Sequence, residues 1–561
     1  MKKNYLLKRT LKHSIGAYLL LGCCLLAVST LYAQNFSLPA DANLLDVTKP
    51  PFNADNTGLT DATSAIQAVL DSAGSGDNSG VTAGSINLVY LPKGTYLISD
   101  ELSWTGNATR DIMHGENRDS VIIKLTDNNP LYASKSISKG LIYTGDFTTP
   151  VAGANRFRNG IYNLTLNTGS GNPGATGVRY FANNQGSINN VLIKSGDGEG
   201  NIGLDLGFSN DNGTLLAKDV TILGFDTGIR TAGVVNSATL QNIKLHNQKV
   251  QAFFNDNQLV SVDNLEVVGE VPGVITQGVA MFTIINSSFT GTGAASGLAA
   301  IHNSNGLFAR NITTTGYLLA IDNSTAGTGI LTIDQDITEF SSHPVLSLYT
   351  NPERSLNLPI KQTPEVPYDD LANWVNIFDF AGSDPDVVTD WAPVLQAAID
   401  SSPPNVTTIY FPNQQVYNFG GDVMIRGNIE RIIGLESKIG RVNVNAFRFI
   451  VDEGTKSQVV IERFNSIGSR IRIVQRSSRT VILKSFEINR TTLEPNSRKV
   501  YLEDVVADRL ILEPGNKAWL RQYNPEFEED IPRIQNKGSD LWILGIKTEQ
   551  DADIATTTQN G

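Results

Sequence analysis

The hexapeptide Leu240-Gln241-Asn242-Ile243-Lys244-Leu245 decides the fold, because its pattern returns 22 residues later as Val262-Asp263-Asn264-Leu265-Glu266-Val267. Each copy alternates apolar and polar residues around a central Asn or Asp, which is typical of a half-buried β-strand. Seven copies follow one another, and their central residues stand at positions 163, 190, 219, 242, 264, 286 and 311. A period of 22 to 29 residues with one strand signal per repeat predicts a parallel β-helix, in which each coil stacks on the previous one.

A second, less regular series begins near residue 459, for example in Val481-Ile482-Leu483-Lys484-Ser485-Phe486. Five prolines between residues 341 and 371 interrupt regular strands and indicate a connector. Each series opens with a short amphipathic helix, after Thr60-Asp61 and after Thr389-Asp390, where the Asp can serve as N-cap. We therefore predict an all-β protein with two tandem right-handed parallel β-helices, each covered at its open end by a short N-terminal capping helix.

The expected divisions of the chain follow from these signals. They are a leader at 1–33, a first β-helix at 34–340, a Pro-rich connector at 341–371, and a second β-helix at 372–561 that looks truncated.

The leader has the features of a cleavable export signal. A basic stretch precedes the apolar run from Ile15 to Val28, and Leu31-Tyr32-Ala33 resembles a signal-peptidase site. Two alternatives are an uncleaved membrane anchor and a lipid anchor at Cys23, since Leu20-Leu21-Gly22-Cys23 fits a lipoprotein signal. The residues after Cys23 are apolar rather than polar, which favours simple cleavage. We expect a secreted, periplasmic or cell-surface protein.

Charge and cysteine content exclude several function classes. Both cysteines lie in the leader, so the remaining chain has no disulfide and no thiolate metal site. The leader also holds five of the 44 basic residues and no acidic one, so its removal changes the formal net charge from −12 to −17. This charge disfavours nucleic acids and anionic membranes as partners. Because the four remaining histidines form no metal-binding motif, we expect no metal or organic cofactor.

The stacked coils predict the kind of partner. Outward residues of successive coils line up in a long polar face, which suits an extended polysaccharide, and we expect the protein to act as a monomer. Residues 426–533 hold 14 Arg and 5 Lys against 15 acidic residues. This local excess of positive charge keeps an anionic glycan open as the substrate.

Several stretches resemble known glycan-active proteins. Phe52-Asn53-Ala54-Asp55, Leu91-Pro92-Lys93-Gly94-Thr95-Tyr96 and Phe378-Asp379-Phe380 are similar to the opening of pectate-lyase-superfamily domains. Lys517-Ala518-Trp519-Leu520-Arg521-Gln522-Tyr523-Asn524-Pro525-Glu526 and Asp540-Leu541-Trp542-Ile543-Leu544-Gly545-Ile546-Lys547-Thr548-Glu549 resemble glycoside hydrolase family 55. The resemblance covers nearly the whole chain after the leader. It implies a secreted, inverting exo-β-1,3-glucanase with its active site between two β-helices.

Two glutamates are the candidate catalytic carboxylates. Glu526 and Glu549 stand 23 residues apart, close to one coil, so they can occupy neighbouring coils on one face. Two carboxylates held so closely raise the pKa of one of them, as a general acid requires. The resemblance implies Glu549 as the general acid, Glu526 as its partner, and Gln185 as the group that orients the attacking water.

Other side chains are candidates for binding the glycan. Trp519 and Tyr523 are close to Glu526 in sequence and could stack on sugar rings. Arg521 points outward by alternation with Leu520 and could bind sugar hydroxyls. The resemblance adds Ser209, whereas Trp542 lies in an apolar run that favours an interior position.

Two other function classes stay open, a polysaccharide lyase that acts on an acidic glycan and a non-catalytic glycan-binding or structural protein. The polygalacturonase residue set is missing apart from an isolated Asp369-Asp370, and no convincing set of clustered Asp with an Arg base indicates a calcium-dependent lyase. Members of the resembled family continue with further coils after the segment matching Glu549. The polar ending from 551 to 561 therefore strengthens the non-catalytic alternative.

Overall fold

The structure is a computed structural model whose compact unit spans Asn35–Gly561. It describes residues 36–558, apart from 74–85, 105–108, 137, 146–155, 209–211, 234–236, 305, 327–330, 333–334, 346–353, 356–357, 414–415, 444, 466–470, 496–498, 527–529 and 550. The predicted export signal and Cys23 lie outside the described residues.

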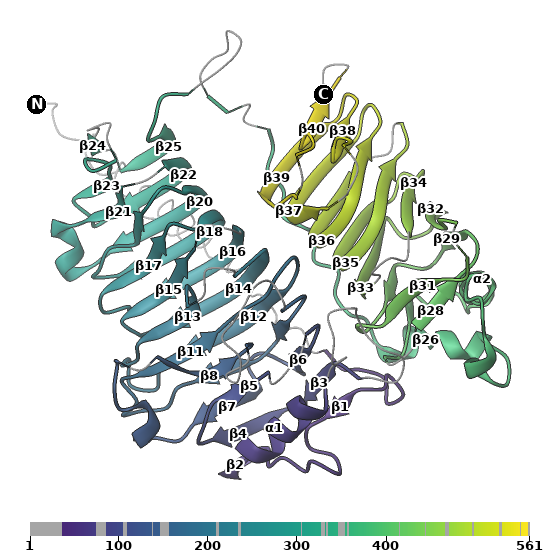
Figure 1. The fold of residues 1–561 in the computed structure, drawn as a ribbon, viewed down its shortest axis with the longest axis horizontal. Coiled ribbons are helices and arrows are strands. Elements are labelled where there is room, and N and C mark those ends of the chain that lie inside the picture. The colour runs from purple at the N-terminus through teal and green to yellow at the C-terminus, as the bar shows by residue number, and fades with distance from the viewer. Residues whose placement is uncertain are drawn as a thin grey trace, which may run out of the picture. The chain divides into compact units, whose positions relative to one another are not determined.

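The first half of the chain folds into two sheets of stacked strands, seen in purple to teal in Figure 1. The strand path of one sheet is β1 (Leu45–Asp46), β3 (Leu88–Leu91), β6 (Ile112–Gly115), β9 (Gly160–Tyr162), β12 (Ser187–Lys194), β14 (Leu215–Leu223), β16 (Ser237–His246), β18 (Leu259–Gly269), β20 (Met281–Gly291), β22 (Gly306–Thr315) and β25 (Asp336–Ser341). Four strands join it off this path, namely β2 (Thr57–Asp61), β4 (Gly94–Ile98), β7 (Val121–Leu125) and β10 (Thr165–Asn167). The other sheet contains β5 (Leu102–Ser103), β8 (Lys139–Tyr143), β11 (Ala175–Arg179), β13 (Ile202–Leu206), β15 (Thr227–Ala232), β17 (Gln251–Asp256), β19 (Val274–Gln277), β21 (Ala299–Asn303), β23 (Leu319–Asp322) and β24 (Leu331–Thr332).

The second half repeats this architecture in green and yellow. Its main sheet contains β26 (Trp374–Asn376), β27 (Thr408–Tyr410), β29 (Val423–Gly427), β30 (Arg431–Ile433), β32 (Arg448–Gly454), β33 (Gln458–Phe464), β34 (Arg472–Gln475), β35 (Thr480–Leu493), β36 (Lys499–Leu512), β37 (Lys517–Pro525), β38 (Ile534–Asn536), β39 (Asp540–Ile546) and β40 (Ala555–Thr557). A small sheet pairs β28 (Val416–Phe419) with β31 (Lys438–Arg441).

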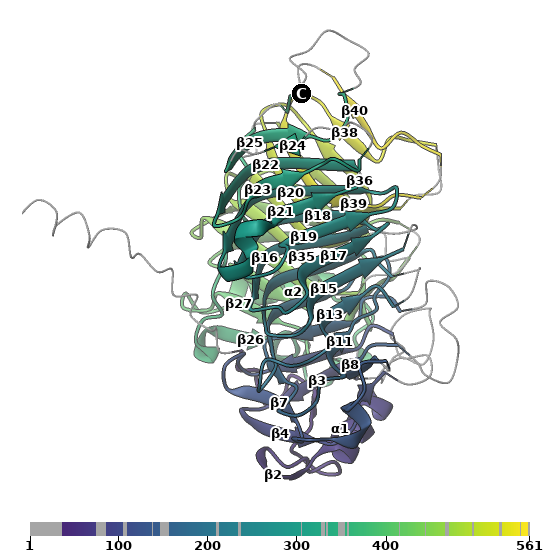
Figure 2. The same cartoon turned by 90° about the vertical axis from the view of Figure 1, so that its left-hand side faces the viewer.

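The strands stack in parallel, as the turned view in Figure 2 also shows for the first half. Among the described strands, only β25 and β24 pair antiparallel with a neighbour, against β22 and β23. They cover the last coil of the first stack, where an open edge would expose unpaired backbone groups. The predicted all-β class with parallel β-helices is confirmed, whereas the division at 341–371 stays a prediction.

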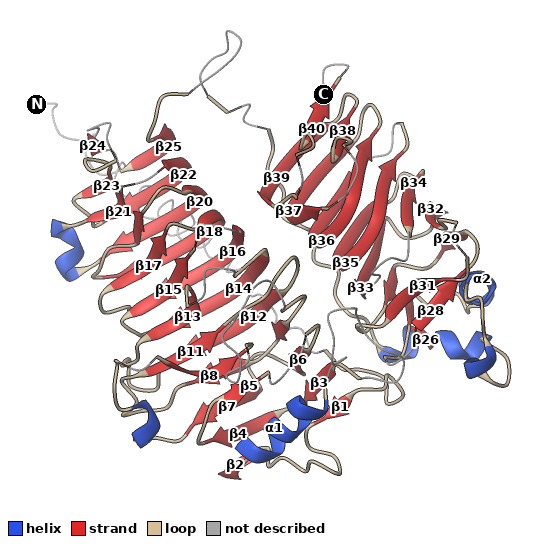
Figure 3. Cartoon of the chain, in the orientation of Figure 1, coloured by secondary structure: helices blue, strands red, loops and turns tan. Residues whose placement is uncertain are grey.

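One short helix covers the start of each stack, as predicted (Figure 3). The helices are α1 (Thr63–Ser72) and α2 (Ala392–Ser401). Each helix begins two residues after the predicted Asp, one residue later than if that Asp were the N-cap. The Asp side chain still accepts the N–H of the first helical residue. Asp61 Oδ1 accepts the Thr63 N–H at 2.9 Å, and Asp390 Oδ1 accepts the Ala392 N–H at 2.9 Å. The apolar sides of the helices belong to two separate hydrophobic cores, one for each stack.

The residues that mark the sequence period form a ladder of left-handed backbone conformations. All seven have positive φ, namely Asn163 (64°), Asn190 (53°), Asp219 (54°), Asn242 (55°), Asn264 (63°), Asn286 (51°) and Asn311 (53°). Asn tolerates this conformation better than most residues because its side chain bonds locally. Here Asn264 Nδ2 donates to Asn242 Oδ1 at 2.9 Å, and Asn242 Nδ2 donates to Asp219 Oδ1 at 2.8 Å. Each coil therefore bends at the same place, and several of the bends are bonded to the bend of the preceding coil.

The connector contacts both stacks. Gln362 Nε2 donates to Asp263 Oδ2 at 2.8 Å in the first stack, and the Lys361 carbonyl accepts from Arg521 Nη2 at 2.7 Å in the second. Glu365 Oε1 accepts from Lys218 at 2.7 Å. Residues 361–365 therefore line the contact between the two stacks.

The ladder predicts a graded response to substitution at Asn242. Asn242→Ala loses two ladder bonds and leaves a residue without a polar side chain in the left-handed region, so we expect the free energy of unfolding to fall by about 2 kcal/mol. Asn242→Gly relieves the backbone strain and should cost about 1 kcal/mol. Denaturant titration measures both, with the exposed Lys244→Ala as a control that stays within about 0.5 kcal/mol. Equal losses for Ala and Gly would contradict a backbone contribution.

Candidate functional site

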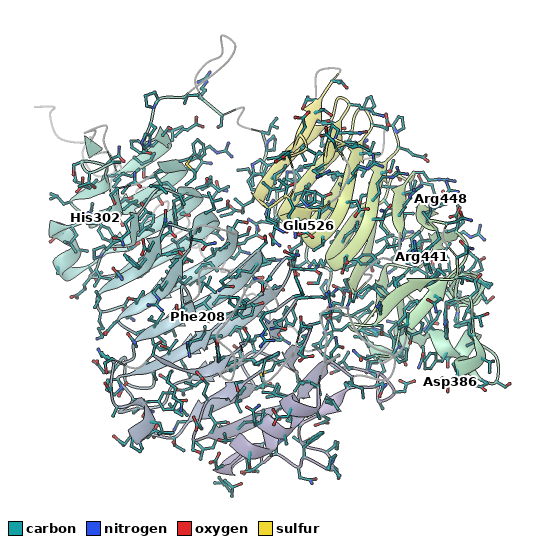
Figure 4. All side chains as sticks on the ribbon, viewed as in Figure 1. Phe208, His302, Asp386, Arg441, Arg448 and Glu526 are labelled. Carbon is teal, nitrogen blue, oxygen red and sulfur yellow. The ribbon has the colours of Figure 1, made fainter. Side chains whose placement is uncertain are left out.

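The predicted glutamates lie at the ends of two neighbouring strands. Glu526 directly follows β37 and is labelled in Figure 4, and Glu549 follows β39. The two strands pair in parallel through Tyr523 and Ile546. The residues after that pair therefore emerge side by side, on the outer surface of the second β-helix.

Lys547 joins the two glutamates. Its ammonium donates to Glu526 Oε1, to Glu549 Oε1 and, at 3.0 Å, to Asn184 Oδ1. Asn524 Nδ2 donates to Glu526 Oε1 at 2.9 Å and to the Asn184 carbonyl at 2.9 Å. The exposed fraction of the side chain rises from 11% for Lys547 to 25% for Glu526 and 54% for Glu549. Glu549 is thus the accessible carboxylate and Glu526 the anchored one.

This arrangement changes the electrostatics expected from the sequence. Two neighbouring carboxylates repel each other, but here a cation stands between them and replaces that repulsion with two ion pairs. Lys547 lies in the stretch that resembles glycoside hydrolase family 55, but it was not predicted as a site residue. Simple alternation from the inward Ile543 would place residue 547 inward, and the bend at Gly545 (φ 76°) turns Lys547 outward beside Glu526.

Asn184 reaches this group from the first β-helix. It has a left-handed backbone (φ 58°) in a turn that docks on the second β-helix. Gln185 Nε2 donates to the Asp504 carbonyl, and the Gly186 N–H donates to Asp504 Oδ1 at 3.1 Å. Gln185 is buried, so its amide holds the turn in place, while the neighbouring Asn184 faces Lys547 and Glu526.

Asp504 is a buried carboxyl in this contact. Burial raises its pKa to about 6, against the opposing effect of the Gly186 N–H and the Arg158 guanidinium. Its other oxygen accepts from Ser485 Oγ at 3.0 Å. Both oxygens therefore have partners, and the carboxyl joins two coils of the second β-helix to the first.

A third carboxyl near the site was missed from the sequence. Glu487 of β35 is half-buried, and burial raises its pKa. Arg110 and Arg158 of the first β-helix oppose that shift, whereas Glu526 adds to it. The available signal was position, since Glu487 stands two residues after the bend at Ser485, as Asn524 does after the bend at Gln522.

Two of the predicted sugar-binding residues hold the connector. Trp519 Nε1 donates to the Pro359 carbonyl at 2.9 Å, and Arg521 Nη2 donates to the Lys361 carbonyl at 2.7 Å. The Arg521 guanidinium lies 4.1 Å from the ring centroid of Trp542, which is half-buried outside the coil rather than interior as expected. Trp519 and Arg521 do point outward, but the connector covers the surface onto which they point.

Tyr523 lies in the core of the second β-helix. Leu520 is also inward and Arg521 outward, so simple alternation would place residue 523 outward. Gln522 has a left-handed backbone (φ 53°), which resets the alternation and turns Tyr523 inward. Ser209 lies outside the described residues, so its predicted role stays a prediction.

The described part of the chain shows neither of two further features. It contains no group of three or more His, Cys, Asp or Glu side chains placed to hold a metal ion. None of its helices is long and apolar enough to cross a membrane.

One family model matches part of the first stack. The model described as "Rhamnogalacturonase A/epimerase, pectate lyase-like" matches residues 50–275. No curated protein matches the chain. Membership of glycoside hydrolase family 55 therefore stays a proposal.

Three similar solved structures differ in source. ORF18 of Geobacillus virus E2 is 18% identical with a TM-score of 0.31, and the match covers 49% of this chain and 62% of the viral one. The chain thus spans less than two thirds of that protein. The catalytic unit of a GH87 α-1,3-glucanase from Streptomyces thermodiastaticus is 12% identical (TM-score 0.32, coverage 94% and 70%). DFA-IIIase from Arthrobacter chlorophenolicus A6 is 11% identical (TM-score 0.34, coverage 86% and 94%).

Burial of Asp504 predicts that its contribution to folding stability changes with pH in the direction opposite to that of an ordinary ion-paired carboxylate. Its pKa of about 6 exceeds the ordinary value of 3.8 for an aspartic acid, so the folded state binds the proton more tightly and this group's contribution to stability falls as pH rises from about 4 to 6. Asp504→Asn retains the shape and removes the titration. We expect the stability of the variant relative to wild type to rise by up to about 3 kcal/mol across that range.

Denaturant titrations at pH 4, 5 and 6 measure this difference. The exposed Asp540→Asn is the control for loss of an acidic residue from the same β-helix. A constant difference between Asp504→Asn and wild type across the range would contradict the assignment.

Proposed function

We propose that this protein is an exported polysaccharide-active enzyme that hydrolyses a glycosidic bond, with β-1,3-glucan as the substrate and Glu549, Glu526, Lys547 and Asn184 as its site. One observation carries the proposal. Two carboxylates from neighbouring coils of one β-helix meet an amide from the other β-helix at a shared ammonium. The pectate-lyase-like match of residues 50–275 supports a glycan as the ligand.

The hydrogen bonds support different proposed roles for the two glutamates. Glu526 accepts from Lys547, Asn524 and Asn184, so it serves as an anchored acceptor that holds the site together. Glu549 is more exposed, and its Oε2 accepts no hydrogen bond from the part of the chain that the structure describes. We therefore propose Glu549 as the general acid, which must carry its proton on Oε2, the oxygen that Lys547 does not contact, when it protonates the leaving oxygen of the substrate.

The distance between the two carboxylates limits which group can orient the attacking water. Both Oε1 atoms contact one ammonium, so they lie closer than the ~6.5–9.5 Å that separates acid and base carboxylates in inverting glycosidases. A water between them has no room, and Glu526 is not the opposing base. In an inverting reaction the water would be oriented by polar uncharged groups, with Asn184 as the contacting amide and Gln185 as the residue that positions its turn.

Hydrolysis of laminarin, a soluble β-1,3-glucan, tests the proposal. Glu549→Gln keeps the size of the side chain and removes the acid, so we expect kcat to fall by about 10²- to 10⁴-fold. Glu513→Gln is the matched control, because Glu513 also pairs with a lysine on the surface of the second β-helix, and its kcat should remain near wild type. No turnover by wild type, or equal turnover by Glu549→Gln, would contradict the assignment.

A panel of other glycans separates the alternatives. If wild type hydrolyses another glucan instead of laminarin, the proposed β-1,3 linkage is wrong, and the proposed role of Glu549 as the general acid is retained. A product that absorbs in the ultraviolet, formed from polygalacturonate, would indicate a lyase. Binding of glycans without turnover would indicate the non-catalytic class.

A further inference from the structure

Four arginines stand in register on consecutive coils of the second β-helix. Arg448 of β32 pairs with Arg472 of β34, Arg472 with Arg490 of β35, and Arg490 with Arg509 of β36. Their side chains lie on the outer surface, because the next residues along the chain include core positions such as Phe449. We call these four residues the arginine row, and Figure 4 labels its first member, Arg448.

The middle of the row has no acidic partner in the described residues. Arg448 at the outer end bonds Asp422, with Nε at 2.9 Å from Oδ2. Arg472 donates only to the amide oxygen of Asn489, at 3.4 Å. Arg490 has a buried Nε without a hydrogen-bond partner. Burial, together with the positive charges of Arg472 and Arg509, lowers the pKa of Arg490.

Elsewhere on this β-helix, most charges in register have opposite signs, and the exception is Lys499 opposite Lys517. Lys484 stands opposite Glu503, and Lys517 stands opposite Asp540. Like charges directly opposite each other on neighbouring strands destabilise a sheet. The arginine row breaks this pattern over consecutive coils, which is expected of a surface whose negative charges come from a ligand.

We propose that the arginine row binds an acidic polysaccharide, with anionic groups of the glycan on Arg472 and Arg490. The guanidinium fork matches the geometry of a carboxylate and bonds it with two parallel N–H donors. Neighbouring coils place the arginines about 4.8 Å apart, which suits an extended chain with one charged group per sugar.

One feature favours a glycan over a nucleic acid. Proteins that bind single-stranded nucleic acid present aromatic side chains on which bases stack. The positions two residues further along the same strands are Ile450, Val474, Thr492 and Ile511.

The row adjoins the site of Glu526. Ala507 of β36 pairs with Pro525 of β37. Arg509 stands two residues after Ala507, and Glu526 stands one residue after Pro525, so the two side chains lie close to the same pair on neighbouring strands. A glycan on the row would therefore run towards the carboxylates. The binding itself does not depend on hydrolysis.

Binding of defined polysaccharides tests the row. Affinity electrophoresis of the full chain uses polygalacturonate, dextran sulfate, neutral laminarin and single-stranded DNA. We expect Arg472→Gln/Arg490→Gln to bind polygalacturonate at least about tenfold more weakly than wild type. The control, Arg426→Gln/Lys517→Gln, removes the same charge from two exposed, acid-paired residues and should change binding by less than about twofold.

Each ligand has a defined consequence. A tenfold loss for polygalacturonate alone assigns the row to carboxylated glycans, and a matching loss for dextran sulfate extends it to sulfated ones. Equal weakening by the control double variant would overturn the row as the site. Wild-type binding of DNA as tight as that of polygalacturonate would overturn the assignment to a glycan.

Thermal unfolding separates ligand binding from a structural role. Without glycan, the row variant should unfold at the same or a higher temperature, because like-charge repulsion is relieved. Polygalacturonate should raise the unfolding temperature of wild type and of the control, but not of the row variant. A lower unfolding temperature of the row variant with unchanged binding would make the arginines structural and overturn the proposal. These readouts need no turnover, so an inactive Glu549 leaves them interpretable.

Discussion

The bend with a left-handed backbone that recurs once per coil is the constraint on which the rest of this structure depends. In the first β-helix the bend is occupied almost throughout by Asn, because Asn adopts positive φ at low cost and, at several coils, its amide donates to the bend of the preceding coil. Stacking then becomes cooperative, since each ladder bond needs the coil below it. The bend also resets the inward and outward alternation, so it decides which side chains line the surface.

The second β-helix keeps the bend and changes its residues. Arg463, Ser485, Asp504 and Gln522 all have positive φ, as does Gly545. Several of these bends contact the first β-helix instead of forming an amide ladder. Asp504 receives Gln185 and Gly186, and a Cβ on Gly545 would lie 1.8 Å from Thr239 Oγ1. The bends that shape the coils therefore also dock the two β-helices, and that docking brings Asn184 to Glu526.

The sequence predicts what is local and periodic and misses what is long-range. Asn242 and its counterparts gave the coil period, and the 23-residue interval correctly predicted that Glu526 and Glu549 lie together. Lys547 was missed because its bonds to Asn184 span 363 residues. Tyr523 was misplaced because the bend at Gln522 inverts alternation. Arg521 was correctly predicted to point outward, but no local pattern indicates that the connector covers it.

Buried charge explains why the two β-helices meet in one register. Arg158 donates to Glu436 at 2.8 Å, and Glu436 also pairs with Arg463 at 2.6 Å, with all three side chains nearly inaccessible. Such pairs add little net stability after desolvation, but breaking one leaves an uncompensated charge in the interface. A shift by one coil, about 4.8 Å, would separate these partners. Because apolar contacts alone tolerate such sliding, the charged contacts are what hold Asn184 opposite Lys547, and the geometry of the site follows from them.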